Sequence, residues 1–178
     1  IARDAGAPMA DDRATLVAHV LALMDRDAKL TGLKQLQGLI WERGYAAGEL
    51  RSHFFDDVPR AIERWRAAGI EVAVYSSGSS AAQRAVFAHS AHGDLSRELR
   101  GFFDTTVGAK RERASYERIS QLLERVTGEL AFLSDVVEEL DAAADAGWKT
   151  VLVVRPGNRP ANGQRHTRIE SFDDLSLL

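Results

Sequence analysis

The sequence predicts an α/β protein, with a parallel β-sheet covered by helices and a helical lobe in front of it. Three observations predict this class. Short apolar runs occur at Ile70–Tyr75, Phe102–Val107, Leu130–Leu133 and Thr150–Val154. Helical segments separate these runs, and the first third of the chain reads as helix throughout. Strands that alternate with helices are typical of a parallel sheet that is buried on both faces.

The front of the chain contains three predicted helices. Asp12–Lys29 and Leu33–Ala47 carry apolar residues at helical spacing, among them Leu16, Val20, Leu36 and Ile40. A third helix is predicted over Val58–Ala68, because Pro59 suits a first turn and Gly69 suits a helix end. We therefore predict a helical lobe over residues 1–54 and an α/β core over residues 55–178.

The core should contain three further helices, each placed between two strands. They are predicted at Ser80–His89, Arg113–Val126 and Val136–Ala146. The segment from Pro156 to Gly163 contains two prolines, two glycines and two asparagines, so it should be a loop.

The composition excludes several classes of function. The chain has 178 residues, of which 45% are hydrophobic and 28% charged, and its net charge is −3. These values are typical of a globular protein and give no indication of a nucleic-acid or membrane partner. Since cysteine is absent, thiol nucleophiles, disulfides and zinc–thiolate sites are excluded. We expect a monomer in the cytoplasm.

Polar residues follow three of the predicted strands, where the ligands of parallel sheets usually bind. Ser76 and Ser77 come after the first strand and before Gly78 and a helix, an arrangement that suits a phosphate group. The next two serines read as helix caps, since Ser80 with Gln83 fits a capping box, and Ser79 can also cap. Whether Ser76 and Ser77 bind a ligand stays open on this pattern alone.

The other two strand ends carry a lysine and an aspartate. Lys110 precedes a helix, where its charge opposes the helix dipole unless a negative group lies nearby. The alternative is a solvated surface lysine. Asp135 could bind a hard cation such as Mg²⁺. Its alternative role is that of a helix cap, with Glu138 and Glu139 in the first turn.

Taken together, the three strand ends indicate phosphoryl transfer. Hydroxyl groups and a lysine can hold phosphoryl oxygens, and a carboxylate can hold the metal ion that neutralises their charge.

The amino-acid sequences of these segments resemble those of a known family. VYSSGS, FFDTTVGAK, FLSDVVEELDAA and VVRPGN are similar to acireductone synthases (enolase-phosphatases), members of the haloacid dehalogenase (HAD) superfamily, and LKQLQGLIWERGYAAGEL is similar to the cap of that family. The resemblance extends from about Leu16 to the end of the chain.

The resemblance implies a fold, a reaction and a set of site residues. The fold would be a HAD-like Rossmannoid sheet with a helical cap. Ser76 and Ser77 would bind the substrate phosphate, Lys110 the phosphate and the nucleophile, and Asp135 the Mg²⁺ cofactor, with Glu139 as a supporting acid. The small phosphorylated substrate would be 2,3-diketo-5-methylthiopentyl 1-phosphate of methionine salvage, which is enolised and then dephosphorylated to acireductone.

The sequence departs from the family at its nucleophile. The family begins with a strand that ends in Asp-x-Glu-Gly-Thr, and this pattern is absent here. Three partial candidates are rejected: Asp25-Arg26-Asp27, placed mid-helix; Asp4, which follows no strand; and Asp56-Asp57, placed in a loop. The simplest expectation is an N-terminally incomplete sequence without turnover of its own.

The absent strand also predicts a feature of the sheet. In the superfamily it lies centrally, so the strands at 70–75 and 130–133 should not pair with each other. Two other functions stay open. One is a related phosphatase with another small phosphate ester as substrate, and the other is a non-catalytic phosphate-binding domain on the same scaffold.

Overall fold

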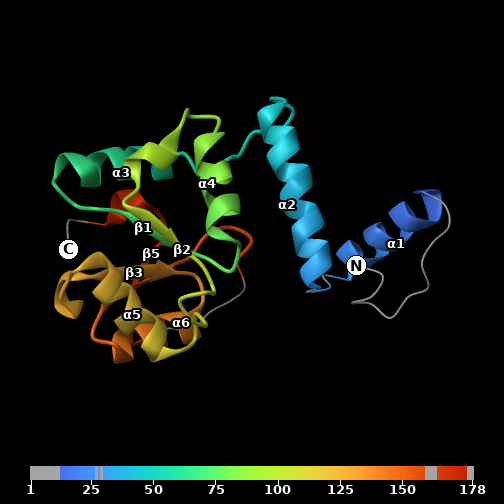
Figure 1. Ribbon diagram of the computed structural model, residues 1–178. Coiled ribbons are helices and arrows are strands. Elements are labelled where there is room, and N and C mark those ends of the chain that lie inside the picture. Colours follow the sequence, from blue (N-terminus) through green and yellow to red (C-terminus); the bar gives the residue numbers. More distant parts are fainter. Residues whose placement is uncertain (1–12, 27, 29, 159–163, 176–178) are drawn as a thin grey trace. The chain divides into compact units, whose positions relative to one another are not determined.

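The computed structural model describes residues 13–26, 28, 30–158 and 164–175 (Figure 1). The chain divides into two compact units, which are described separately. Unit 1 comprises Ile1–Arg51 and unit 2 comprises Ser52–Leu178.

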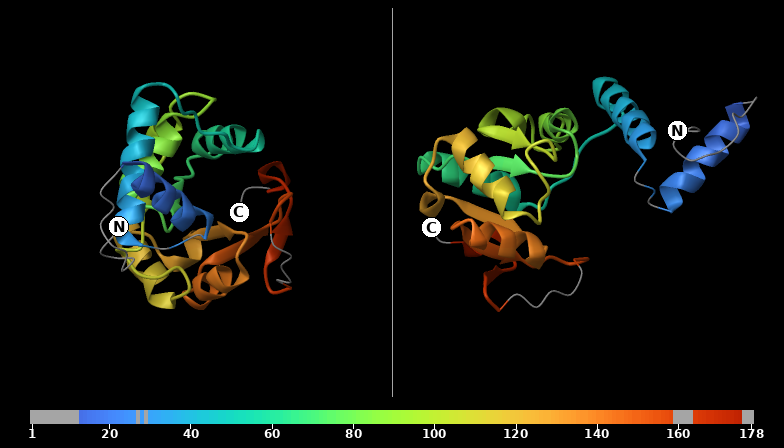
Figure 2. Two further views of the ribbon diagram at one scale, coloured as in Figure 1. Left: turned by 90° about the vertical axis from the view of Figure 1, so that its right-hand side faces the viewer. Right: turned by 60° about the horizontal axis from the view of Figure 1, so that its bottom comes forward.

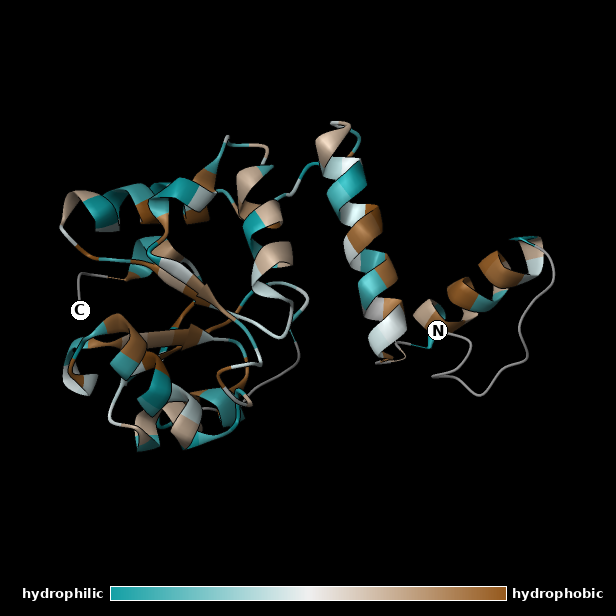
Figure 3. Cartoon of the chain, viewed as in Figure 1, coloured by the Kyte–Doolittle hydropathy of each residue, from teal (hydrophilic) through white to brown (hydrophobic). Residues whose placement is uncertain are grey.

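Unit 1 contains the first two predicted helices, α1 (Arg13–Asp25) and α2 (Thr31–Ala46). Apolar residues cover much of α1 (Figure 3), yet only Leu23 of that helix is buried. Since α1 ends at Asp25, the predicted mid-helix position of Asp25-Arg26-Asp27 was wrong. Asp27 and the other candidate Asp4 lie outside the described residues.

Unit 2 begins with α3 (Asp57–Ala67), which starts one residue earlier than predicted. Asp57 therefore lies in the first helical turn and not in a loop, a correction to the sequence prediction. The helix ends as expected, because Gly69 has a φ of 77° and donates its N–H to the Arg66 carbonyl.

A strand is present at each of the four predicted positions. The first two strands are shorter than their apolar runs, whereas the other two have the same length as their runs and are shifted by one residue. The four strands are β1 (Ala73–Tyr75), β2 (Gly101–Phe103), β3 (Ala131–Ser134) and β4 (Lys149–Val153). A fifth strand, β5 (Thr167–Ile169), was not predicted. The connecting helices are α4 (Ser80–Ala88), α5 (Arg113–Leu123) and α6 (Val137–Asp145), with short 3₁₀ turns at Leu95–Glu98, Thr127–Glu129 and Phe172–Asp174.

The strands form two separate parallel ladders (Figures 1 and 2). One ladder joins β1 to β2 with Val74 opposite Phe102. The other has the order β3-β4-β5, with Leu133 opposite Val151 and Val151 opposite Thr167. Among the described residues no ladder joins β1 to β3. The expectation that these two strands do not pair directly is therefore confirmed.

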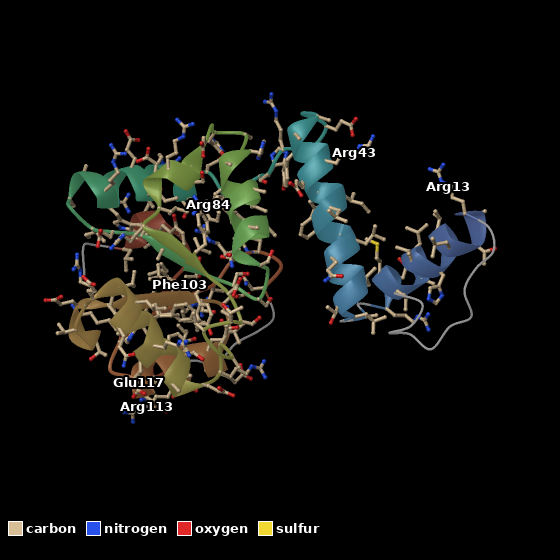
Figure 4. All side chains as sticks on the ribbon, in the orientation of Figure 1. Arg13, Arg43, Arg84, Phe103, Arg113 and Glu117 are labelled. Atoms are coloured by element: carbon tan, nitrogen blue, oxygen red, sulfur yellow. The ribbon has the colours of Figure 1, made fainter. Side chains whose placement is uncertain are left out.

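A pocket of about 560 Å³ separates the two ladders, and we call it the interstrand slot. Backbone and side chains of β1 and β3 line it, together with Trp65, Phe103 (Figure 4) and Trp148. Both strands are only half-buried, whereas Val151 and Leu152 of β4 are almost fully buried. The two strands that border the slot therefore lack the burial that is usual inside a parallel sheet.

Two apolar clusters form the core of unit 2. The first surrounds Trp65, Val151 and Ile169, and the second surrounds Tyr116 and Trp148. Phe132 of β3 packs against the second cluster, with its ring centroid 5.1 Å from that of Tyr116. Of the helices in the described ranges, none has the length and apolar character needed to cross a membrane.

Candidate active site at the strand ends

The segment after β1 folds into a turn that opens α4. The backbone N–H of Ser76 continues the ladder to the Phe103 carbonyl at 3.1 Å. Ser79 caps the helix, as predicted, by accepting the N–H of Ala82 at 3.2 Å. The capping box of Ser80 with Gln83 was wrong, because the Gln83 amide instead donates to the carbonyls of Gly78 and Phe103 at 2.8 and 2.9 Å.

Neither Ser76 nor Ser77 caps α4. Ser76 is half-buried and its hydroxyl accepts only a long bond, of 3.3 Å, from the Gly78 N–H. Ser77 is exposed. Both hydroxyl groups are thus able to donate to a ligand at the end of β1.

Asp104 follows β2, and its side chain forms hydrogen bonds to the start of α4 and to Thr106. Its carboxylate accepts the Ser80 N–H at 2.9 Å and the Thr106 hydroxyl and N–H at 2.6 and 3.0 Å. These bonds, chiefly the one from the Thr106 hydroxyl, lower the pKa of Asp104. Asp104 was not predicted as a site residue, because the predicted strand over Phe102–Val107 included it, whereas β2 ends at Phe103.

Lys110 lies in a turn whose backbone conformation is closely constrained. Gly108 has a φ of 136°, and a Cβ at this position would lie 2.2 Å from the Ser115 hydroxyl oxygen. The Ser115 hydroxyl donates to the Ala109 carbonyl at 2.7 Å, and the buried Tyr116 hydroxyl donates to the Lys110 carbonyl at 2.6 Å. The start of α5 therefore fixes the backbone of the lysine.

The Lys110 side chain is not a solvated surface group. Its ammonium nitrogen lies 2.5 Å from a Glu139 carboxylate oxygen, and the two side chains are 22% and 12% exposed. The same nitrogen lies 5.8 Å from the Tyr75 ring centroid and 5.7 Å from that of Phe132. These contacts place Lys110 beside both the strand that leads to Ser76 and the strand that leads to Asp135.

Glu139 is the negatively charged group near Lys110 that offsets the unfavourable position of the lysine before a helix. Its Oε2 also accepts the Ser134 hydroxyl at 3.0 Å. From the sequence we had placed Glu139 as a support of the metal site, whereas the structure pairs it with Lys110 and with the last residue of β3. The carboxylate thus links the ammonium group to the strand end.

Asp135 comes directly after β3 and is exposed. It does not cap α6, since the cap position is occupied by Val136. Its carboxylate instead accepts a short hydrogen bond from the Asn158 amide. None of the ion pairs in the described part of the chain involves Asp135.

A pocket of about 1070 Å³ opens at this point, and we call it the strand-end pocket. It is lined by residues from the ends of β3 and β4 and from the start of unit 2, among them Phe55, Ser134, Asp135, Arg155, Asn158 and Phe172.

The donor set of the strand-end pocket suits Mg²⁺. Within the described residues no three His, Cys, Asp or Glu side chains are grouped closely enough to enclose a metal ion. A zinc site built from three or more such side chains is therefore not found among the described residues. Two carboxylates line the pocket, Asp135 and Glu138, and no ion pair of the described residues neutralises either. One or two carboxylates fit Mg²⁺, which completes its shell with water and phosphate oxygens.

Comparisons with known proteins identify the family. The model of the haloacid dehalogenase-like hydrolases matches residues 4–147. Enolase-phosphatase E1 of Sorangium cellulosum is 50% identical over 161 residues, which cover 90% of this chain and 69% of that protein. Enolase-phosphatase E1 of Synechococcus elongatus is 46% identical over 98% of this chain and 75% of that protein.

A solved structure agrees with this assignment. The crystal structure of the unknown transcript 4 protein of Saccharomyces cerevisiae superposes with a TM-score of 0.83 at 36% identity, over 93% of this chain and 76% of that one. The match to its fold, the family model and the two relatives lead to one conclusion: this chain belongs to the haloacid dehalogenase-like hydrolases, in the group of the enolase-phosphatases E1.

Proposed function

We propose that the protein is a Mg²⁺-dependent enolase-phosphatase (acireductone synthase) of methionine salvage. Its substrate would be 2,3-diketo-5-methylthiopentyl 1-phosphate. The observation that carries the proposal is the Lys110–Glu139 pair between the ends of β1 and β3, in a chain 50% identical to an enolase-phosphatase. The substrate itself rests on the family, because the residues proposed here would contact only its phosphate group.

Each strand end would have a separate task. The hydroxyls of Ser76 and Ser77 would donate to phosphoryl oxygens, and Lys110 would use the donors that Glu139 leaves free for the same purpose. Asp135 would hold Mg²⁺, which supplies charge neutralisation at the phosphoryl group when it is bound. Glu139 would keep the ammonium group aimed at the phosphate.

The attacking group would come from the family pattern Asp-x-Glu-Gly-Thr, which residues 1–178 do not contain. Without an attacking carboxylate the remaining groups can bind phosphate and metal but cannot form a covalent phosphoryl intermediate. We further propose that residues 1–54 act as a cap over a core at 55–178, and that the protein works as a monomer in the cytoplasm.

The test compares the 178-residue chain with a version extended at its N-terminus by a segment that carries the Asp-x-Glu-Gly-Thr pattern. Phosphate release is measured with the diketo substrate and with a panel of small phosphate esters. We expect no turnover by the 178-residue chain and Mg²⁺-dependent turnover by the extended one, with the diketo ester preferred.

Two controls make the outcome decisive. The extended chain with asparagine in place of the attacking aspartate should be inactive. Turnover by the 178-residue chain that disappears in Asp135→Ala would contradict the account of the nucleophile. A preference of the extended chain for another ester would favour the related phosphatase, and phosphate binding without any turnover would favour the non-catalytic domain.

A further inference from the structure

Unit 2 contains a buried ion pair that none of the roles above uses. Asp57, in the first turn of α3, is 5% exposed, and its Oδ2 lies 2.5 Å from an Nη2 of Arg155. The Arg155 side chain is 12% exposed. The two residues are 98 positions apart in the sequence, so the pair joins the start of the unit to the end of β4.

Three donors converge on one oxygen atom of Asp57. Besides Arg155, the hydroxyl of Ser171 donates to it at 2.9 Å and the N–H of Phe172 at 2.6 Å. This arrangement fixes the carboxylate of α3 to two other segments of the chain, at Arg155 and at 171–172, and the carboxylate in turn fixes one end of the guanidinium group.

The guanidinium group is also held by aromatic rings. Its carbon lies 4.6 Å from the Phe55 ring centroid and 5.1 Å from that of Phe172. Arginine combines a planar fork with stacking on aromatic rings, so these contacts restrict its orientation more than an ion pair alone would. Both rings and Arg155 line the strand-end pocket.

A short path of hydrogen bonds leads from Arg155 to Asp135. The Arg155 N–H donates to the Asn158 side-chain oxygen at 2.6 Å, and the Asn158 N–H donates back to the Arg155 carbonyl at 3.0 Å. The amide nitrogen of the same Asn158 side chain donates to Asp135. The side chain of Asn158 thus has its direction set by the backbone of Arg155.

We infer that Asp57 and Arg155 are positioning residues, which fix the loop 155–158 so that Asn158 orients the Asp135 carboxylate toward a divalent cation. The inference rests on the proposed function for its metal ion. A buried ion pair is rarely a net source of stability compared with apolar residues of similar size, so its stacked and threefold-bonded geometry fits positioning better than stabilisation. Partners that orient a metal ligand typically contribute 10- to 100-fold in affinity.

The decisive variant replaces the pair by apolar residues, Asp57→Leu with Arg155→Met. This double variant leaves no charge buried without a partner. The Ser171 hydroxyl and the Phe172 N–H lose their acceptor, however, so it should fold with a lower thermal stability than the parent. The probe is Mn²⁺ alone, as a substitute for Mg²⁺, with the free ion followed by electron paramagnetic resonance. We expect the double variant to bind Mn²⁺ about 10-fold more weakly than the parent.

Asp173 provides a matched control, because it lies in the same 3₁₀ turn as Phe172. Asp173 pairs with Arg60 and Arg64 at 2.7 and 3.2 Å, but it is 43% exposed and does not line the strand-end pocket. Asp173→Asn should leave Mn²⁺ affinity unchanged. Asp57→Asn alone, which keeps the shape of the side chain, should weaken Mn²⁺ binding in the same direction as the double variant.

A second readout separates this inference from the proposed function. Hydrogen exchange of the backbone amides of Arg155, Gly157 and Asn158 should be faster in the folded double variant than in the parent and in Asp173→Asn. Unchanged exchange, or parent-like Mn²⁺ affinity where Asp135→Ala abolishes binding, would overturn the positioning role. If Asp135→Ala leaves Mn²⁺ binding intact, the assignment of Asp135 as a metal ligand in the proposed function fails. Faster exchange in the double variant would still support the conclusion that Asp57 and Arg155 fix the loop 155–158.

Discussion

Lys110 has a carboxylate on one side and two aromatic rings within 6 Å of its ammonium nitrogen. The rings of Tyr75 and Phe132 cover part of the side chain, and the Glu139 carboxylate fixes the direction of its ammonium group. An ammonium group prepared in this way loses little conformational freedom when an anion arrives.

Replacement of Lys110 by methionine should therefore weaken phosphate binding. A hydrogen bond to a charged group contributes about 1.5–3 kcal/mol, so we expect a decrease in affinity of roughly 10- to 100-fold. The measurement is a titration of the 178-residue chain with inorganic phosphate in the presence of Mg²⁺. Lys149→Met is the control, because Lys149 is exposed at the start of β4, and its affinity should equal that of the parent.

Asp57 should make the fold sensitive to acid. Burial raises the pKa of its carboxyl group, but the bonds from Arg155, Phe172 and Ser171 lower it further, to about 2. Because the folded pKa lies below the ordinary value of 3.8, the resulting stability is complete above about pH 5 and is lost as the pH falls toward 2.

The expected contribution is about 2 kcal/mol in free energy of unfolding. Urea unfolding at pH 5 and at pH 2.5 would measure it in the parent and in Asp57→Asn. The parent should lose more stability between these two pH values than the variant, since the variant has no carboxyl group to protonate. Equal losses would show that the pair with Arg155 does not hold Asp57 ionised.

At the scale of the elements, the edges of β1 and β3 that border the interstrand slot differ from their other edges. In a strand, successive N–H groups point to opposite sides. The ladder bonds at Val72 and Ser76 show that Val74 faces β2, so Ala73 and Tyr75 face the slot. Each buried backbone group left without a partner costs about 1–3 kcal/mol, so these edges should open readily.

Amide hydrogen exchange should show this alternation directly. We expect the N–H groups of Ala73, Tyr75, Ala131 and Leu133 to exchange at least 10-fold faster than those of Val74 and Phe132, which bond to β2 and β4. Nuclear magnetic resonance would resolve the individual amides. Equal protection at all six positions would mean that the slot closes in solution and that the two ladders join.

Much of the element order could be predicted from the sequence, since each of the four apolar runs overlaps a strand. β5 was missed because its three residues offer a single apolar side chain, Ile169, after a loop rich in turn residues. Its pairing with β4 is a tertiary contact, and a strand this short gives no periodicity of its own.

The positions of the candidate site residues could be predicted where these residues lie in a turn after a strand, and less so where they depend on partners distant in the sequence. Ser79, Lys110 and Asp135 lie at the predicted turns. The partner of Lys110 was not identified, because Glu139 reads equally well as a first-turn acid or as support for a metal ion. The link of Asp57 to Arg155 crosses 98 residues, and neither burial nor pairing over that span is visible in a single sequence.

At the scale of the whole molecule, the candidate site lies entirely within unit 2. Both pockets are lined only by residues from Phe55 onward, and Lys110, Glu139 and Asp135 belong to the same unit. Unit 1 by contrast exposes several large apolar side chains, among them Leu21, Leu39, Ile40 and Trp41.

A chain that begins at Ser52 should therefore keep the affinity of the parent for phosphate and Mn²⁺ within about two-fold, because every group proposed to bind them is retained. Calorimetric titration of both chains would test this. A loss of 10-fold or more, in a shortened chain that circular dichroism shows to be folded, would place part of the binding site in unit 1.

The two buried tryptophans give the interstrand slot an optical property. Trp65 and Trp148 belong to different apolar clusters and both line the slot, whereas Trp41 is 45% exposed in unit 1. With Trp41 replaced by phenylalanine, the remaining indole fluorescence comes from the walls of the slot alone. Any extended segment that enters between β1 and β3 would change the surroundings of both indoles and therefore their emission, so the occupancy of the sheet centre can be followed by fluorescence without a label.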